Sequence, residues 1–429
     1  MPTFSARIPA DLTPAPLARA LDARRAAGLP VLDLTTSNPT RAGFTIDAAE
    51  LAAAFVHEEA AYYEPHPRGL PPARAAVAAY YATRGITLPT ERIHCTASTS
   101  EAYAFLFMLL AEPGDEILVP QPSYPLIEYL AGLQSIALGR YNLRYNATEG
   151  WRIDATSLEA ARSPRTRAVV AVSPDNPTGS YLHPDDLVLL ERWCAEHDLA
   201  LIVDEVFHDY PLRDDAVRTS AATRDGDALV FSLNGVSKIL ALPQLKFGWI
   251  ATRGPAAAVA RALDALDFIA DTYLSVSTPV QLAVPALLAR ADAMQQPILT
   301  RCRENLAVLR DQFAGHAGAE LLRADGGWYA VLRVDDDHAR RLVAAEASPG
   351  AGDDATEVRG HVARARSRNA SPPLDESLAL MLLERHGIHL HPGYFFDFRA
   401  GVHLVASLLS DAADLRDGAA RLAQLLRLS

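Results

Sequence analysis

The middle of the chain alternates short apolar or β-branched runs with longer stretches in which apolar residues recur at helical spacing. In residues 184–197, Leu187, Leu190 and Cys194 follow one another at intervals of three and four, which predicts an amphipathic helix. The short runs predict strands at residues 93–96, 116–119, 168–172, 200–203, 228–232 and 247–251. Strands that alternate with helices indicate an α/β domain with a mostly parallel central sheet flanked by helices.

The last hundred residues follow a different pattern. Apolar runs at 321–323 and 328–333 flank a Gly-Gly turn, and a third run lies at 402–407. We expect a smaller α+β domain formed by the two chain ends, residues 1–45 together with 320–429, beside a large domain of residues 46–319. Residues 348–372 are rich in Gly, Pro, Ser and Arg and lack apolar periodicity, so they predict an exposed, mobile insertion in the small domain.

Length and charge exclude several classes of protein. A chain of 429 residues exceeds what one hydrophobic core usually supports, which favours two domains. The net charge of −12 and the absence of a basic cluster argue against a nucleic-acid partner. The longest apolar run, residues 102–111, is too short to span a bilayer, and the amino terminus lacks a hydrophobic signal core. We therefore expect a cytoplasmic protein without a membrane partner.

Three isolated cysteines, Cys95, Cys194 and Cys302, show no Cys-x-x-Cys spacing. They form neither a disulfide framework nor a metal site in this pattern, and we interpret them as small buried hydrophobic residues. This composition is typical of a reducing compartment.

Lysine is almost absent from the chain. Lys238 and Lys246 are its only two lysines, so 38 of the 40 basic residues are arginine. A guanidinium stays protonated in proteins, whereas a buried lysine amine can lose its proton and attack a carbonyl carbon. Chance retention of two lysines in an arginine-rich chain is the alternative. The pattern favours a lysine that is kept for amine chemistry.

Polar residues follow several predicted strands, at the sheet edge where α/β proteins bind ligands. Residues 96–102, Thr-Ala-Ser-Thr-Ser-Glu-Ala, lead into a helix and could bind a phosphate, although Ser or Thr before a helix is also a common N-cap. Tyr124 lies in the rigid turn Pro-Gln-Pro-Ser-Tyr-Pro, where it either stacks on a flat ligand or is a surface residue. Asn176 and Asp204 lie at the ends of two further strands.

Together these segments resemble the class I and II aminotransferases, which are fold type I pyridoxal-5′-phosphate (PLP) enzymes. The resemblance depends on Asn-Pro-Thr-Gly at 176–179, Asp-Glu at 204–205, Ser-Lys at 237–238 and Leu-Pro-x-x-Lys-x-Gly-Trp at 242–249, in this order and spacing. It runs from about residue 34 to residue 407. It implies the PLP-dependent transferase fold of type I and PLP as the cofactor.

The resemblance also implies a role for each residue. Lys238 would hold PLP as a Schiff base and then act as general base, while Asp204 would keep the pyridine nitrogen protonated. Asn176 would hydrogen-bond the ring 3′-oxygen, and Tyr124 would stack on the ring. The implied phosphate-binding residues are Ser98, Thr99, Ser100, Ser237 and Lys246. Lysine at position 246 replaces the arginine usual in the family and supplies a point charge in place of a two-pronged donor.

Tyr63 resembles the tyrosine that reaches across to the phosphate in the partner subunit. This implies a homodimer with two shared active sites, and packing of Tyr63 between two helices is the alternative. The implied partners are an amino acid donor and a 2-oxo acid acceptor, between which an amino group moves.

Two positions depart from the family pattern. Phe207 replaces a tyrosine that donates to the ring 3′-oxygen, so we predict a raised pKa for the Lys238 Schiff base unless Tyr210 supplies the hydroxyl. Val405 replaces the arginine that clamps the substrate carboxylate, which a valine cannot bind. Arg399, with Asn38 on the opposite wall, is the nearest substitute, and a solvated surface arginine is the alternative.

Aminotransferase is the predicted activity. A PLP lyase or decarboxylase on the same fold is the alternative, because Val405 leaves the substrate anchor open and the anchor decides which bond is broken. A binding protein that keeps the fold without turnover is a third possibility. The presence of Lys238, Asp204 and Asn176 together counts against it.

Overall fold

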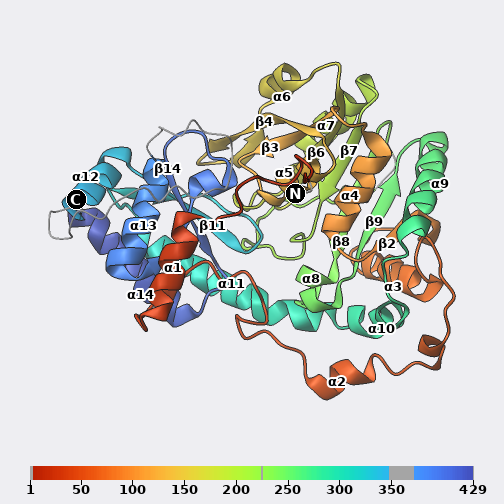
Figure 1. Cartoon of the computed structure of the whole chain (residues 1–429), viewed down its shortest axis with the longest axis horizontal. Helices are drawn as coiled ribbons and strands as arrows, with labels where there is room; N and C mark the ends of the chain where they lie inside the picture. Colours follow the sequence, from red (N-terminus) through yellow and green to blue (C-terminus); the bar gives the residue numbers. More distant parts are fainter. Residues whose placement is uncertain (1–2, 224–225, 347–371, 429) are drawn as a thin grey trace.

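The computed structural model describes residues 3–223, 226–346 and 372–428. The chain forms a large sheet covered by helices and, beside it, a smaller sheet with its own helices (Figure 1). The insertion predicted at residues 348–372 lies, except for its last residue, outside the described residues and stays a prediction.

The large sheet has eight strands, of which six run in one direction. Only β9 and β5 are antiparallel to their neighbours. In spatial order the strands are β2 (Ile93–Thr96), β9 (Gly248–Arg253), β8 (Leu229–Gly235), β7 (Ala200–Asp204), β6 (Thr166–Val172), β3 (Glu116–Gln121), β4 (Ala137–Asn146) and β5 (Gly150–Ile153). The predicted α/β fold with a mostly parallel sheet is confirmed, and each of the six predicted strands overlaps an observed one.

Helices cover both faces of this sheet, because its strand residues alternate between two apolar cores. In β3, Ile117 and Val119 pack with helices on one face, and Leu118 packs with helices on the other. The first face carries α4 (Thr99–Leu110), α5 (Leu126–Leu133) and α9 (Ala256–Tyr273); the second carries α6 (Ala155–Ala161) and α7 (Pro184–Glu196). Helix α7 confirms the helix predicted at 184–197.

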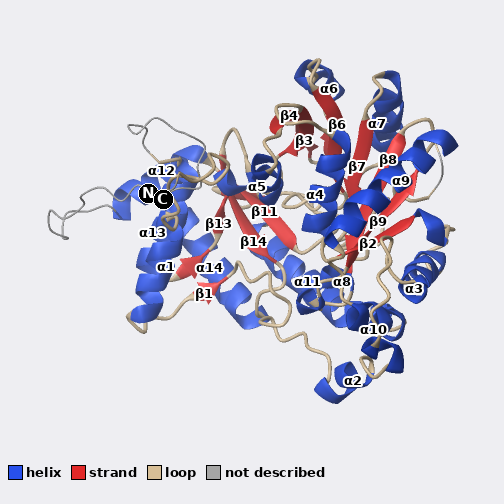
Figure 2. Cartoon of the chain, turned by 45° about the vertical axis from the view of Figure 1, so that its right-hand side comes forward, coloured by secondary structure: helices blue, strands red, loops and turns tan. Residues whose placement is uncertain are grey.

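The small sheet has the order β10 (Ala319–Leu321), β11 (Tyr329–Val334), β14 (Val402–Ser407) and β13 (His391–Pro392). A separate parallel pair, β1 (Leu32–Asp33) with β12 (Ile388–His389), joins the amino-terminal segment to the carboxyl-terminal one. The surrounding helices are α1 (Pro16–Ala26), α12 (Asp336–Glu346), α13 (Leu374–His386) and α14 (Ala412–Leu428). The segment from α1 to β1 and the carboxyl-terminal segment therefore share this part of the molecule, where Figures 1 and 2 both show α1 beside α13.

The remaining helices connect the two sheets or lie outside them. Helix α11 (Ala291–Phe313) packs against both α14 and α8 (Val236–Ile239), so it bridges the small sheet and the edge of the large one. The others are α2 (Ala48–Ala53), α3 (Pro71–Ala82), α10 (Thr278–Leu288) and the short 3-10 turns η1 (Glu58–Ala61), η2 (Thr90–Arg92), η3 (Pro243–Leu245) and η4 (Gly393–Phe396). None of the described helices combines the length and the apolar character needed to cross a bilayer.

Candidate active site

Most of the predicted site residues meet at one edge of the large sheet. Asp204 ends β7, Asn176 follows β6, Tyr124 follows β3, and Lys238 lies just after β8. Because these strands are parallel, their carboxyl ends lie along the same edge. The sheet therefore brings together side chains that are separated by up to 114 residues in sequence.

Lys238 lies in the one-turn helix α8, with its amine beside two aromatic rings that contact each other. Its Nζ is 4.8 Å from the ring centre of Trp328 and 5.2 Å from that of Phe207. Burial lowers the pKa of Lys238 to about 8, although the charge of Asp204 raises it. The Tyr210 hydroxyl donates to the Lys238 backbone carbonyl at 2.5 Å. Tyr210 thus fixes the lysine backbone, and its hydroxyl is not the substitute considered for the one that Phe207 lacks.

The Asp204 carboxylate is held by two hydrogen bonds. The Val206 backbone N–H donates to Oδ1 at 3.1 Å, and the Tyr103 hydroxyl donates to Oδ2 at 3.2 Å. Burial nevertheless raises the pKa of Asp204 to about 6. Sequence reasoning missed Tyr103; the signal was its position on α4, four residues after Thr99 and so on the same helical face.

The predicted phosphate-binding residues lie around the first turn of α4. The Ser98 hydroxyl accepts a hydrogen bond from the Glu101 N–H at 3.1 Å, so Ser98 is also the N-cap of this helix. A Cβ at Gly248 would lie 3.1 Å from the Ser98 carbonyl carbon and 3.2 Å from the Thr99 nitrogen. The Val236 N–H donates to the Phe247 carbonyl at 3.0 Å. These contacts bring the segment of Ser237 beside that of Lys246, which is exposed and adopts a left-handed conformation with φ of 53°.

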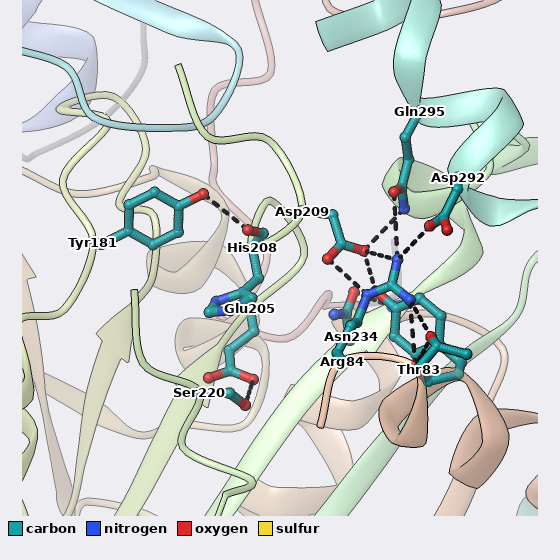
Figure 3. Close-up of polar contacts among 12 residues, drawn as sticks. Thr83, Arg84, Tyr181, Glu205, His208, Asp209, Ser220, Asn234, Asp292 and Gln295 are labelled. Carbon is teal, nitrogen blue, oxygen red and sulfur yellow. Dashed lines mark hydrogen bonds and ion pairs between the residues drawn. The ribbon is translucent and has the colours of Figure 1, made fainter. Parts of the chain in front are cut away.

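The segment after β7 is anchored from both sides (Figure 3). On one side, the Glu205 carboxylate accepts hydrogen bonds from the Ser220 hydroxyl at 2.8 Å and the Ala221 N–H at 2.6 Å. On the other, Asp209 pairs with Arg84 at 2.9 Å. Burial raises the pKa of Asp209, but its hydrogen bond and charge interaction with Arg84 outweigh this and lower it. These anchors fix the positions of the intervening residues, including Phe207.

Asn176 is buried, and its Oδ1 has no hydrogen-bond partner within the described chain. Tyr124 is 41% exposed beside the sheet edge. Burial, and next the negative charge of Asp204, raise the pKa of Tyr124, so the two side chains interact electrostatically. Both residues thus lie in the same region as Lys238 and Asp204.

The small sheet carries an apolar side chain at the position where the family pattern has a carboxylate-binding arginine. Val405 is fully buried in β14, paired with Val331 on one side and His391 on the other. The Ser407 N–H donates to the Leu34 carbonyl at 2.7 Å, which brings the segment leading to Asn38 against the end of β14.

The two predicted carboxylate ligands differ in their surroundings. Asn38 Oδ1 accepts a hydrogen bond from the Thr40 hydroxyl at 2.7 Å, which shapes a tight turn. Arg399 is exposed in the loop after η4 and forms no ion pair with the residues that the structure describes.

A polar contact between the two sheets was not predicted. The Ser123 N–H donates to the Phe396 carbonyl at 2.9 Å, and the Gln121 side-chain amide donates to the Asp397 carbonyl at 2.9 Å. Arg140 on β4 pairs with the Asp397 carboxylate and, at 2.9 Å, with Glu128. These contacts fix η4 against the turn that carries Tyr124. The contacts of Phe396 and Asp397 join residues more than 250 positions apart, so no local sequence pattern could have revealed them.

Tyr63 lies away from this cluster, in the segment between η1 and α3, and is 77% exposed. Tyr62, at 69%, and Phe268 on α9, at 77%, are also exposed large apolar residues. The described residues contain no group of His, Cys, Asp and Glu arranged to hold a metal ion.

Comparisons with known proteins agree with this geometry. The sequence model of the family described as "Aminotransferase class I and II" matches residues 30–416. Over 318 residues the chain is 26% identical to an alanine aminotransferase of Mycobacterium tuberculosis, covering 73% of each chain. Over 262 residues it is 30% identical to the glutamate-pyruvate aminotransferase AlaA of Escherichia coli, covering 61% of this chain and 64% of the relative.

Solved structures share the fold over the full length. An alanine aminotransferase from Pyrococcus furiosus superposes with a TM-score of 0.81 at 20% identity and covers 100% of both chains. An aminotransferase from Escherichia coli gives a TM-score of 0.79 at 23% identity, covering 100% of this chain and 98% of the other. Nothing in these comparisons favours a lyase or a decarboxylase. The chain belongs to the class I and II aminotransferases, and it is a PLP-dependent enzyme that transfers amino groups.

Proposed function

We propose that this enzyme moves the amino group of a small neutral amino acid such as alanine to a 2-oxo acid, with Lys238 as the residue that carries PLP. The observation that carries the proposal is the partly buried pair of Lys238 and Asp204 at the carboxyl edge of the sheet. PLP, held through a Schiff base to Lys238, supplies an electron sink for the bond that breaks at the substrate Cα.

The residues present fit this cofactor. The close approach of Gly248 to Ser98 and Thr99 leaves no room for a side chain beside the backbone N–H groups that open α4, as a phosphate cradle requires. Asn176 is buried just after β6, where its side-chain amide nitrogen can donate to the ring 3′-oxygen. We assign the phosphate to Ser98, Thr99, Ser100, Ser237 and Lys246, the pyridine nitrogen to Asp204, and the ring face to Tyr124.

Lys238 then acts as the base at the substrate Cα. A general base works best when its pKa lies close to the working pH, and burial brings the pKa of Lys238 to about 8. The Tyr210 hydroxyl, through its hydrogen bond to the Lys238 carbonyl, holds the lysine backbone in place while the side-chain amine takes up the substrate proton.

The choice of a small neutral donor is supported by the relatives, which are named for alanine or for glutamate and pyruvate. It is also supported by the apolar pair of Phe207 and Trp328 beside Lys238, and by the valine at position 405. We keep Arg399 and Asn38 as the proposed ligands of the substrate carboxylate. Arg399 is exposed and could turn toward a bound substrate.

We also propose a homodimer with shared active sites. A cluster of exposed apolar side chains supports it, with Tyr62 and Tyr63 before α3 and Phe268 and Tyr273 on α9, since large apolar residues on a surface mark interfaces. In this assembly Tyr63 would reach the phosphate of the partner subunit. The three cysteines are buried and unpaired, which supports the proposal of a reducing, cytoplasmic location.

The test follows the visible absorption of the PLP-loaded enzyme while L-alanine is added without an acceptor. We expect the band of the lysine-bound cofactor to disappear as one equivalent of pyruvate forms, and to return when a 2-oxo acid is added. Release of ammonia or CO₂ in place of this reversible half-reaction would identify a lyase or a decarboxylase and contradict the proposal.

A further inference from the structure

Phe207 leaves one position beside Lys238 without a polar group. Its ring centre is 5.2 Å from Lys238 Nζ, and the side chain is 4% exposed. A phenylalanine there cannot donate a hydrogen bond to a ligand bound at the lysine. Tyr210, the nearest tyrosine in sequence, already donates its hydroxyl to the Lys238 carbonyl. The donor, if this site has one, must come from another element.

Trp328 offers such a donor. Its side chain is fully buried, and its indole Nε1 has no hydrogen-bond partner among the residues that the structure describes. The indole ring centre is 4.8 Å from Lys238 Nζ and 5.1 Å from the ring centre of Phe207. Buried N–H groups without a partner are rare in folded proteins because they lose their hydrogen bonds to water. The Trp328 ring lies beside the reactive amine, so its unpartnered N–H is a candidate donor to a ligand bound there.

The backbone explains why Trp328 reaches the site from the small sheet. The Gly327 N–H donates to the Tyr210 carbonyl at 2.9 Å, and the Gly326 N–H donates to the Gly179 carbonyl at 2.8 Å. A Cβ at Gly326 would lie 2.8 Å from the Pro174 side chain, so only glycine allows this approach. The turn before Trp328 is thus fixed to the two segments that carry Phe207 and Asn176.

We propose that the Trp328 indole N–H donates a hydrogen bond to the ring 3′-oxygen of bound PLP, in place of the hydroxyl that Phe207 lacks. Asn176 lies in the segment to which the turn before Trp328 is hydrogen-bonded through Gly326 and Gly179. The inference rests on the proposed role of Lys238 and adds a residue that neither the family pattern nor the sequence reasoning assigned. Trp328 would then be a ligand of the cofactor and not only a packing residue.

The chemistry predicts the sign of the effect. A donor to the 3′-oxygen stabilises its negative charge, and that charge in turn favours the proton on the neighbouring lysine-bound nitrogen. Removing the donor leaves more charge on the oxygen and raises the pKa of that nitrogen. Asp204 is the charged group that acts on Lys238 within the described chain, and it is unchanged by a substitution at Trp328.

The test is a pH titration of the visible absorption of the PLP-loaded enzyme. In Trp328→Phe, which keeps an aromatic ring but removes the N–H, we expect the apparent pKa of the bound cofactor to rise by about one unit, a tenfold change in proton affinity. Trp151→Phe is the matched control, because Trp151 is also buried with an unpartnered Nε1 but packs with Tyr145 and Phe398. The control should titrate as the wild type does.

A double-substitution cycle separates this role from simple packing. Phe207→Tyr supplies a second donor, so Trp328→Phe should raise the pKa less in that background than in the wild type. An unchanged pKa in Trp328→Phe, or an equal rise in Trp151→Phe, would overturn the inference. A wild-type protein that shows no PLP absorption at all would instead overturn the proposed function of Lys238.

A second measurement needs no change at Trp328. The chain has four tryptophans, so the apoenzyme labelled with ¹⁵N at the indole nitrogens gives a simple spectrum that single substitutions of the other three can assign. We expect PLP to move the Trp328 Nε1–H resonance downfield, as a new hydrogen bond does. A resonance that stays at its apoenzyme position while PLP binds would contradict the inference.

Discussion

Two carboxylates five residues apart, Asp204 and Asp209, should have opposite effects on the stability of the apoenzyme. Burial raises the pKa of Asp204 from 3.8 to about 6, a shift of about two units. At about 1.4 kcal/mol per unit, the ionised carboxylate costs the folded apoenzyme about 3 kcal/mol. A group whose pKa is raised on folding favours the folded state at low pH, and this contribution is lost as the pH rises through about 6.

Asp204→Asn removes the charge and keeps an acceptor oxygen for the Val206 N–H. We therefore expect the apoenzyme of this variant to be more stable than the wild type by about 3 kcal/mol at pH 8 and by about half as much at pH 5. The same variant should lose affinity for PLP, because the pyridine nitrogen loses its ionic partner. The wild-type enzyme would thus keep a carboxylate that destabilises its apo form because the same carboxylate is needed to bind the cofactor.

Asp209→Asn is the matched control, and it should change the stability of the apoenzyme in the opposite direction. The interaction with Arg84 lowers the pKa of Asp209, so its carboxylate stabilises the folded state above pH 4 and this contribution is lost as the pH falls. Removing one partner of a buried ion pair should destabilise the apoenzyme by about 3 kcal/mol at pH 8.

Urea denaturation at pH 5 and pH 8 measures both effects, with all proteins at one concentration because self-association adds to apparent stability. A lower urea midpoint for Asp204→Asn than for the wild type at pH 8 would show that the ionised Asp204 carboxylate does not destabilise the apoenzyme. So would an increase of equal size at both pH values, since the effect would then not arise from ionisation.

Three further predictions concern the site. The rate at which the apoenzyme captures PLP should rise about tenfold per pH unit up to about pH 8 and then level off, because only the neutral Lys238 amine attacks; a flat profile in stopped-flow absorption would exclude this. Lys246→Gln should weaken PLP binding at least tenfold in a fluorescence titration, while Lys246→Arg retains it, because the phosphate needs a cation there. Equal affinities in all three proteins would show that Lys246 does not bind the phosphate. Arg399→Ala should raise the KM for alanine at least tenfold without changing the absorption of bound PLP, and an unchanged KM would exclude Arg399 as the carboxylate ligand.

Local patterns predicted the strands whose ends carry the candidate site residues. The strand Ile93–Thr96 has the predicted bounds, and Val402–Ser407 does so in the small sheet. The hairpin of β4 and β5 was missed, because β4 mixes residues such as Arg140, Asn142 and Arg144 with apolar ones and is only partly buried. Polar residues on the exposed face of β4 interrupt the apolar run that a sequence search would find.

The positions of the candidate site residues that belong to motifs could be predicted, whereas contacts made by residues distant in sequence could not. Lys238, Asp204 and Asn176 lie at strand ends with motif spacing, and the sheet brings them to one edge. Tyr103 and Trp328 have no motif: one reaches Asp204 from a helix, and the other reaches Lys238 from the other sheet. Such contacts depend on how α4 and the Gly-Gly turn pack, which only the folded chain determines.

We propose that Lys238, and not the second lysine, carries the cofactor. Reduction of the PLP-loaded enzyme with borohydride, followed by peptide mass spectrometry, tests it directly because the chain offers only two lysine side chains. We predict a single phosphopyridoxyl group on the peptide that contains Lys238, and none on that peptide in Lys238→Ala. A phosphopyridoxyl group on Lys246, or no stable adduct at all, would contradict the assignment of PLP to Lys238.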